Sequence, residues 1–254
     1  MSLRLKNPHS ILAALQTRPQ DVFEIRLPKR GGGAEAWDAV RDMAELHRIP
    51  HAQGRSIEER RGHRRQKGGG RQDDGGREGA GEAGVRELPG VTLGELFAGA
   101  QERAGGCGLW LALDCIQDPH NIGAIIRTAA FFGVQGLLLT ADRSAPLSST
   151  VYDVAAGGME YLSFTVQTNL VRSLEIAKEA GVWTLGSSEH AEMSVDDVPR
   201  DRPWLLLIGN EAKGLRRLTS ENCDQICRIT PRGGVTSLNA SVAAGIMIAK
   251  LAGG

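Results

Sequence analysis

The sequence predicts an α/β fold of two parts, with a mostly parallel sheet in the larger, C-terminal part. From residue 109 onward, short apolar runs alternate with longer stretches of helical spacing. The run WLLLI at 204–208 has the wholly apolar composition of a strand buried on both faces. A glycine-rich segment without an apolar pattern separates this part from a smaller one before it. Alternating strands and helices favour a sheet covered on both faces.

Length and composition limit the class of protein. The 254 residues suit one large domain or two modest ones, and 41% apolar residues suffice for a core. No apolar run reaches the roughly 18 residues of a membrane span, so we expect no membrane association. The first residues, MSLRLKNPHSILAALQ, lack the pattern of a secretory signal. A cytoplasmic protein is therefore expected.

Residues 1–60 are expected to form a small α/β unit. The expected elements are a helix over His9–Gln16, a strand over Asp21–Leu27, a helix over Ala34–His47 and a short strand near Ile49. In the second helix, the apolar residues Trp37, Val40, Met43 and Leu46 fall on one stripe.

Residues 61–88 are expected to be a flexible linker. Eight of the 17 residues from 68 to 84 are glycine, and this composition cannot bury enough apolar surface to order the chain. Residues 55–71 carry seven Lys or Arg against two Glu, although the whole chain has zero formal charge. Such a cluster suits a phosphate backbone, and a solvated linker face is the alternative.

Residues 89–254 are expected to form the larger α/β domain. The expected strands are Leu109–Asp114, Gly136–Thr140, Leu162–Val166, Val182–Gly186, Trp204–Ile208 and Ile226–Ile229. The expected helices are Ile122–Phe132, Ser148–Ala156, Asn169–Ala180 with Asn169 as N-cap, Arg217–Asp224 and Ser237–Leu251. Ligands of such sheets bind at the carboxyl ends of the strands, so the loops there are the informative ones.

The first informative loop is DPHNIGAIIRTA, residues 118–129, which follows the strand at 109–114. Asn121 stands at the helix start, where its side chain can cap the helix or reach a ligand. Arg127 lies about a turn and a half further on, and its long side chain can reach back toward the loop. Gly123 allows the backbone to be approached closely.

The second and third loops also carry polar residues beyond ordinary turn chemistry. In LLLIGNEAKGL, residues 205–215, Glu211 directly follows a buried strand between glycines, although a solvated turn would show the same residues. In ITPRGGVTSLNASVAAGIMIA, residues 229–249, a glycine-rich loop leads to Ser237, Asn239 and Ser241. All three are N-cap residue types, and one helix start needs only one cap.

Several other classes of site are not indicated. The chain has no GxGxxG fingerprint after its first strand, no GxxxxGK[ST] loop and no GxSxG elbow. Four cysteines, Cys107, Cys115, Cys223 and Cys227, lack CxxC spacing, and the histidines form no HExxH pattern. We therefore expect small thiols rather than a metal site.

Taken in order, the three loops resemble motifs 1, 2 and 3 of the SpoU/TrmH family of RNA ribose methyltransferases, within the SPOUT superfamily. The resemblance covers about residues 109–251, and residues 145–162 also resemble the stretch between motifs 1 and 2. The sequence departs from the family at Ile229-Thr230-Pro231, where Ile-Pro-Met is common. The resemblance implies a C-terminal trefoil knot, S-adenosylmethionine as cofactor, RNA as substrate, a homodimer and no metal.

The resemblance also assigns site residues. The catalytic set that it implies is Asn121, Arg127, Glu211, Ser237 and Asn239. The cofactor-binding set that it implies is Gly209, Asn210, Ile229, Ser237, Leu238 and Asn239. An arginine keeps its proton in proteins, so Arg127 is expected to position phosphate and hydroxyl, and to act near the other subunit's cofactor. Glu211 is expected to orient Arg127 or Asn121 by charge-assisted hydrogen bonding.

Residues 1–60 weakly resemble the small L30e-like RNA-binding domain of family members that modify 23S rRNA. The family's His-Gln-Gly segment is not recognisable, and GHRRQKGGG at 62–70 stands near its position. Family members that act on tRNA generally lack this domain, so its presence favours a guanosine ribose of 23S rRNA as the substrate.

Three other interpretations remain open. One is the same reaction on tRNA, or on an rRNA site linked to antibiotic resistance. Another is a non-catalytic RNA-binding protein, which the intact Asn121, Arg127, Glu211 and Asn239 argue against. The last is a metabolic α/β enzyme with a different nucleotide, which the missing phosphate-binding fingerprints argue against.

Overall fold

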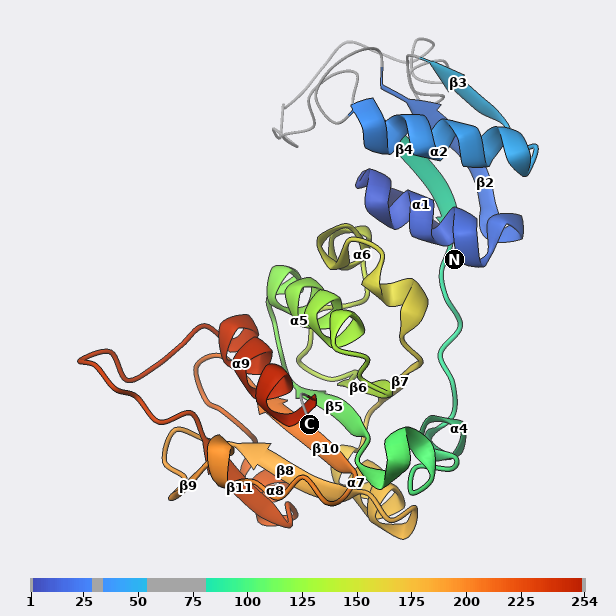
Figure 1. The fold of residues 1–254 in the computed structure, drawn as a ribbon. Helices are drawn as coiled ribbons and strands as arrows, with labels where there is room; N and C mark the ends of the chain where they lie inside the picture. Colours follow the sequence, from blue (N-terminus) through green and yellow to red (C-terminus); the bar gives the residue numbers. More distant parts are fainter. Residues whose placement is uncertain (1, 29–33, 54–80, 253–254) are drawn as a thin grey trace. The chain divides into compact units, whose positions relative to one another are not determined.

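The computed structural model describes residues 2–28, 34–53 and 81–252. The chain divides into two compact units, Met1–Glu87 and Leu88–Gly254, which Figure 1 shows along the colour gradient. Each unit has its own sheet. In the described ranges, no helix is both long and apolar enough to cross a bilayer.

The N-terminal unit is a four-stranded sheet in the order β1-β4-β2-β3, with two helices packed against each other. Its elements are β1 (Ser2–Leu5), α1 (Pro8–Thr17), η1 (Pro19–Asp21), β2 (Val22–Leu27), α2 (Ala34–Leu46), β3 (His51–Gln53) and β4 (Glu82–Arg86). The pairs β1–β4 and β2–β4 are antiparallel, and β2–β3 is parallel. Both predicted helices and the strand over 21–27 are confirmed within one residue at each end.

The end of the expected linker belongs to the N-terminal unit, whereas the second unit begins within one residue of the expected position. Residues 82–86 of the expected linker form β4, which lies between β1 and β2 and belongs to the first sheet. Ala83 and Val85 are fully buried there, and this burial stabilises the strand. The glycine-rich sequence around them gave no apolar pattern from which the strand could be predicted. Residues 61–80 of the expected linker and the basic stretch at 55–71 lie outside the described residues.

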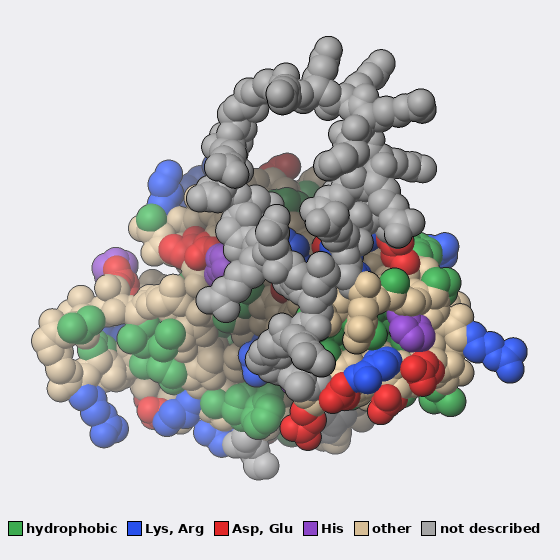
Figure 2. All heavy atoms as spheres, turned by 90° about the horizontal axis from the view of Figure 1, so that it is seen from above, with side chains coloured by type: hydrophobic (Ala, Val, Ile, Leu, Met, Phe, Trp, Pro, Cys, Tyr) green, Lys and Arg blue, Asp and Glu red, His purple; other side chains and the backbone are tan. Residues whose placement is uncertain are grey.

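Charged side chains on the first sheet form cross-strand ion pairs. Arg4 contacts Glu24 at 2.5 Å, and Arg26 contacts Glu82 at 2.5 Å. Figure 2 shows basic and acidic side chains interspersed over the described atoms of the face in view. The exposed Arg4–Glu24 pair contributes at most about 1 kcal/mol, so burial of the apolar face is the larger contribution to the stability of the unit.

The C-terminal unit is a seven-stranded, all-parallel sheet in the order β7-β6-β5-β10-β8-β11-β9 (Figure 1). Its strands are β5 (Leu109–Asp114), β6 (Gly136–Thr140), β7 (Phe164–Gln167), β8 (Trp183–Ser187), β9 (Met193–Ser194), β10 (Trp204–Gly209) and β11 (Gln225–Arg228). All six predicted strands are confirmed, and β9 is an additional one. The two central strands β5 and β10 are buried along their whole length, as the apolar run at 204–208 predicted.

Helices cover both faces of this sheet, as predicted. They are α4 (Leu93–Phe97), α5 (Pro119–Phe131), α6 (Ser149–Ala155), α7 (Leu170–Glu179), α8 (Arg217–Glu221) and α9 (Ala240–Ala252), with 3-10 turns η2 (Arg103–Gly106), η3 (Gly158–Tyr161) and η4 (Val195–Asp197). Helix α5 packs against α6 and α9, whereas α4 and α7 pack against each other (Figure 1). Alternate residues of β5 and β10, such as Trp110 and Leu205, enter the core beneath α4 and α7.

Two helix starts differ from the prediction. Helix α5 begins at Pro119, because Asp118 is its N-cap and accepts a hydrogen bond from the His120 N–H at 2.8 Å. Asn121 therefore lies inside the first turn and is not needed as a cap. Helix α9 begins at Ala240, not at Ser237, because Asn239 is the residue that accepts hydrogen bonds from the first turn.

Gly123 is expected to be essential for the packing of α5 on α6. A Cβ at this position would lie 2.6 Å from Val154 Cβ and 2.9 Å from the Val151 carbonyl oxygen. We expect Gly123→Ala to lower the free energy of unfolding by about 1–3 kcal/mol, measured by urea denaturation. The control is Gly94→Ala in α4, where a Cβ meets nothing within 4 Å and helix propensity alone predicts a small gain. Equal stabilities of the two variants would contradict this account.

Candidate active site

The three loops singled out in the sequence lie at one edge of the second sheet. Strands β5 and β10 are parallel neighbours, with Asp114 opposite Gly209 at their carboxyl ends. The loop after β5 leads into α5, and the loop after β10 contains Asn210 and Glu211. The third loop joins β11 to α9, which packs against α5.

A row of hydrogen bonds connects one side chain from each loop. Asn121 Nδ2 donates to Glu211 Oε1 at 3.0 Å, and Asn239 Nδ2 donates to Asn121 Oδ1 at 3.0 Å. Residues separated by 90 and 118 positions in the sequence are thus in direct contact. We call Asn239, Asn121, Glu211 and Asn210 the amide–carboxylate row. Asn121 is 6% exposed, so its amide orientation is fixed by these partners.

Asn239 has two functions at once. Its Oδ1 accepts from the Ser241 N–H at 2.9 Å, the Ser241 hydroxyl at 2.6 Å and the Val242 N–H at 3.4 Å, which caps α9. Its Nδ2 is left to donate to Asn121. The third loop was predicted to hold more polar residues than one helix cap requires. Asn239 accounts for part of this excess, because it both caps α9 and donates a hydrogen bond to Asn121 of the first loop.

The loop after β10 folds tightly on itself. Asn210 Oδ1 accepts from the Ala212 and Lys213 N–H groups, and the Asn210 and Gly214 backbones pair in both directions. A Cβ on Gly209 would lie 2.2 Å from the Gly214 carbonyl carbon, so only glycine fits there. Asn210 Nδ2 donates to Glu211 Oε2 at 3.2 Å and to the Cys115 carbonyl at 2.9 Å. The loop therefore presents Glu211 toward Asn121.

Arg127 stands apart from the row in the same chain. It lies six residues beyond Asn121 on α5, so the two side chains point about 120° apart and sit about 9 Å apart along the axis. Its side chain is exposed and makes no ion pair with any residue that the structure describes. Of the two partners expected for Glu211, the structure has Asn121 in contact and not Arg127.

The loop from Ile229 to Asn239 is the open part of the site. Within the described residues, the backbone of 229–238 makes no backbone–backbone hydrogen bond. Ser237 is exposed, Leu238 is 49% exposed and Val235 is 76% exposed. The departure from the family at Thr230 gives one contact, from its hydroxyl to Ser194 Oγ at 3.4 Å. The loop thus offers free backbone groups and exposed apolar side chains.

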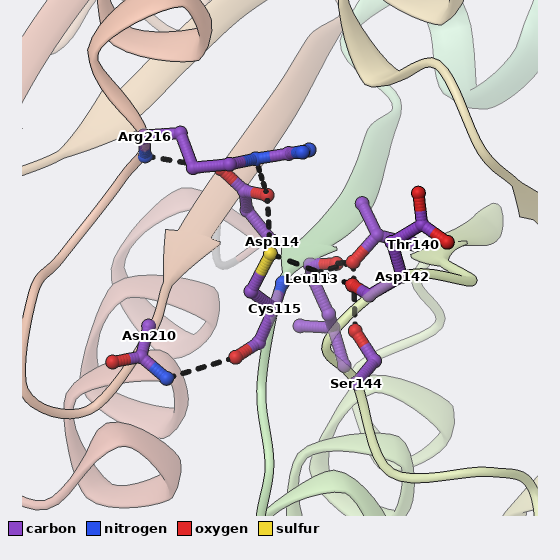
Figure 3. Close-up of polar contacts among 8 residues, drawn as sticks. All are labelled: Leu113, Asp114, Cys115, Thr140, Asp142, Ser144, Asn210 and Arg216. Atoms are coloured by element: carbon purple, nitrogen blue, oxygen red, sulfur yellow. Dashed lines mark hydrogen bonds and ion pairs between the residues drawn. The ribbon is translucent and has the colours of Figure 1, made fainter.

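A second polar cluster, which the sequence patterns did not single out, is linked to the row by the hydrogen bond from Asn210 to the Cys115 carbonyl (Figure 3). Asp114, at the end of β5, is fully buried and contacts Arg216 Nε at 2.7 Å. Its neighbour Cys115 has a φ of 62° and donates its N–H to Thr140 Oγ1 at 2.9 Å. The sequence did contain a signal for this cluster, because Asp114 ends the apolar run LWLALD. A carboxylate buried with such a strand needs a charged or hydrogen-bonding partner.

Two of the four cysteines, Cys223 and Cys227, have thiols of low reactivity. Burial raises the pKa of Cys223 and of Cys227 to about 12, so both thiols stay protonated at neutral pH. All four cysteines are free, and Cys115 is buried. Among the described residues, no three His, Cys, Asp or Glu side chains are grouped as a metal site would require.

A parallel α/β sheet with a polar row at its carboxyl edge places this unit among the α/β enzymes that bind a ligand at that edge. Comparison with known proteins gives a narrower assignment. The chain belongs to the SpoU rRNA Methylase family, whose model matches residues 108–249. The family predicted from the three motifs is therefore confirmed.

Individual relatives agree with the family. The chain is 40% identical over 173 residues to the 23S rRNA (guanosine-2′-O-)-methyltransferase RlmB of Pseudomonas aeruginosa, covering 67% of this chain and 70% of that protein. It is 34% identical over 242 residues to RlmB of Pseudomonas putida, covering 94% and 92%. The solved structure of the SpoU methyltransferase AviRb from Streptomyces viridochromogenes, in complex with AdoMet, shares the fold, with a TM-score of 0.74 and 22% identity over 99% of this chain and 89% of that one.

Proposed function

We propose that this protein transfers a methyl group from S-adenosylmethionine to the ribose 2′-hydroxyl of a guanosine in 23S rRNA. The observation that carries the proposal is the amide–carboxylate row, which brings Asn239, Asn121 and Glu211 together from three separate loops of a SpoU-family chain. The Pseudomonas putida relative, named for 23S rRNA, aligns across both units. This favours 23S rRNA over the same reaction on tRNA or on an rRNA site linked to antibiotic resistance.

The open loop has the chemistry that a nucleoside cofactor needs. Adenine presents polar edges and an apolar ring face, and the unpaired backbone of 229–238 and the exposed Leu238 offer partners for both. We assign cofactor contacts to Gly209, Asn210, Ile229, Ser237, Leu238 and Asn239. When bound by these residues, S-adenosylmethionine would supply an electrophilic sulfonium methyl for the ribose 2′-oxygen, with S-adenosylhomocysteine as the leaving group and the hydroxyl proton passing to water.

The residues of the row orient the ribose. Glu211 Oε1 accepts one hydrogen bond from Asn121, and Oε2 accepts one from Asn210. Each carboxylate oxygen can accept a further hydrogen bond, and because the side chain is exposed, a ribose hydroxyl can donate it. Asn121 and Asn239 hold Glu211 in this orientation before RNA arrives, which reduces the reorganisation needed at the moment of transfer. Ser237, which is exposed and lies two residues before Asn239, is assigned to the same catalytic set.

Arg127 acts across a homodimer in this proposal. Its side chain points away from the row of its own chain, on a helix that also exposes Phe131, which is 82% accessible. Tyr161 of the adjoining η3 is 60% accessible, so this surface carries large apolar side chains suited to a second copy of the chain. A guanidinium from the second copy would hold phosphate and hydroxyl by its fork of N–H donors.

We further propose that the C-terminal unit is threaded as a trefoil knot and that the N-terminal unit is an L30e-like RNA-binding domain. In support of the knot, β10 enters between β5 and β8, and the following α9 returns to α5. In support of the second assignment, the N-terminal unit is a compact α/β fold with its own sheet.

The reaction is tested by transfer of a tritiated methyl group. The full chain is incubated with labelled S-adenosylmethionine and 23S rRNA from a strain that lacks the gene, and the labelled nucleotide is mapped. If only tRNA were labelled, tRNA and not 23S rRNA would be the substrate. If no RNA were labelled, the proposed enzymatic function would be rejected in favour of RNA binding without catalysis.

Cofactor binding should be measurable without RNA, because the loops that we assign to it belong to one folded unit. S-adenosylmethionine at a hundred times its dissociation constant should stabilise the native chain by about 2.7 kcal/mol, seen as a rise in Tm. ATP at the same concentration is the control, since the chain lacks a phosphate-binding loop. A rise with ATP alone would instead support a metabolic nucleotide enzyme.

Removal of residues 1–87 tests the RNA-binding unit. We expect the shortened protein to keep its affinity for S-adenosylmethionine, since every assigned cofactor contact lies in the second unit. Its affinity for RNA should fall, and the slope of log K against log salt should become shallower as phosphate contacts are lost. Both are measured by filter binding over a salt series. Unchanged RNA affinity would give the N-terminal unit another role.

A further inference from the structure

The loop that carries Glu211 is anchored at both ends to two consecutive residues, and the proposed reaction does not use this feature. At the start of the loop, Asn210 Nδ2 donates to the Cys115 carbonyl at 2.9 Å. At its end, Arg216 donates its backbone N–H to Asp114 Oδ2 at 3.2 Å, and its Nε lies 2.7 Å from Asp114 Oδ1 (Figure 3). Glu211 lies between these two anchors.

Asp114 is a costly residue to place at this position. Its side chain is fully buried, whereas the Arg216 side chain is 38% exposed. Burying a carboxylate costs several kcal/mol of desolvation, and apolar residues of similar volume often serve stability equally well. A contribution to stability therefore explains this ion pair poorly. Its geometry explains it better, because one carboxylate binds both the backbone N–H and the side chain of Arg216.

Cys115 is held in an unusual backbone conformation by the same cluster. Its φ of 62° lies in the left-handed region, which costs a non-glycine residue energy. Its N–H is bound by Thr140 Oγ1, and its thiol lies 3.4 Å from Asp114 Oδ1 and 3.6 Å from the Asp142 carbonyl. Strand β6 thereby fixes the Cys115 peptide with its carbonyl turned to Asn210, as Figure 3 shows.

We propose that Asp114 and Arg216 are a positioning pair, which fixes the 210–216 loop so that Glu211 meets Asn121 in the orientation required for methyl transfer. The inference rests on the proposed function, because its readout is the rate of that transfer. Neither side chain touches the row directly. Their effect passes through the loop backbone, and a displacement of about 1 Å at a reacting centre can cost about a hundredfold in rate.

The test removes the pair without leaving a buried charge. In the double variant Asp114→Leu with Arg216→Met, both charges are replaced by apolar groups, a change that proteins often tolerate without loss of stability. We expect a Tm close to that of the wild type, an unchanged KM for RNA, and a single-turnover methylation rate lower by about ten- to a hundredfold. A folded double variant with the wild-type rate would overturn the proposal.

A single variant and a matched control separate positioning from other roles. Arg216→Gln should lower kcat and leave the KM for RNA unchanged. A raised KM with normal kcat would overturn the proposal, because Arg216 would then bind RNA itself. The control is Lys178→Gln, which breaks the 2.9 Å ion pair with Asp224 and whose side chain is 37% exposed. Lys178→Gln should lower the Tm but leave the methylation rate unchanged. If the rate fell in proportion to the Tm, and equally so in Lys178→Gln and Arg216→Gln, the proposal would be overturned.

The failure of this inference can be told from failure of the proposed function. If wild-type protein methylates 23S rRNA and the double variant does so equally well, only the positioning role is wrong. If the wild type transfers no methyl group to any RNA, the proposed function fails first and the positioning role falls with it.

Discussion

Arg127→Ala is expected to lower the single-turnover rate of methyl transfer at least about a hundredfold, with unchanged affinity for S-adenosylmethionine. A charge that acts on the transition state contributes about 10²- to 10³-fold in rate. Arg127 is exposed and has no ion-pair partner among the described residues, so its removal should cost the fold almost nothing. Rate is measured by rapid quench with enzyme in excess over RNA, and affinity by calorimetry.

Two control variants sharpen this experiment. Arg127→Lys keeps the charge but loses the fork of donors, and should recover little of the rate. Arg172→Ala removes another exposed arginine, which pairs with Glu175 on α7, and should leave the rate unchanged. Near-normal methylation by Arg127→Ala would remove this residue from the active site and with it the proposed role in substrate positioning.

Glu211→Gln is the second substitution with a large expected effect. Glutamine keeps the shape but replaces one carboxylate oxygen by an N–H₂ group, which would then face Asn121 Nδ2 or Asn210 Nδ2, donor against donor. We expect a fall of about a hundredfold in the single-turnover rate. The change in Tm should be small, because the side chain is exposed. Glu221→Gln on α8 is the control, since in the described part of the chain that carboxylate forms a surface ion pair with Arg217.

The two inactive variants together report on the homodimer. If Arg127 of one chain serves the row of the other, a mixed dimer of Arg127→Ala and Glu211→Gln chains contains one site with neither change. Mixing the variants under conditions of subunit exchange should therefore restore methylation. No recovery from demonstrably mixed dimers would place Arg127 in the site of its own chain.

Most strands and helices of the second unit followed from local pattern alone. The strands at 109–114 and 136–140 have the predicted bounds, because an apolar run bounded by polar residues marks its own ends. Strand β4 was missed for the opposite reason. Its sequence, EAGVR, has little intrinsic strand character, and it is a strand because β1 and β2 flank it on both sides.

By itself, the sequence determined which loops carry the candidate site and which family the chain belongs to, because motif residues next to strand ends are a local property. Only the tertiary structure decided how these residues pair. It made Asp118 the cap of α5 and brought Asn121 into contact with Glu211. It also paired Asp114 with Arg216, 102 positions apart. Such contacts depend on the order of strands in the sheet and on the direction of each side chain from its helix, and neither is encoded in the spacing of residues along the chain.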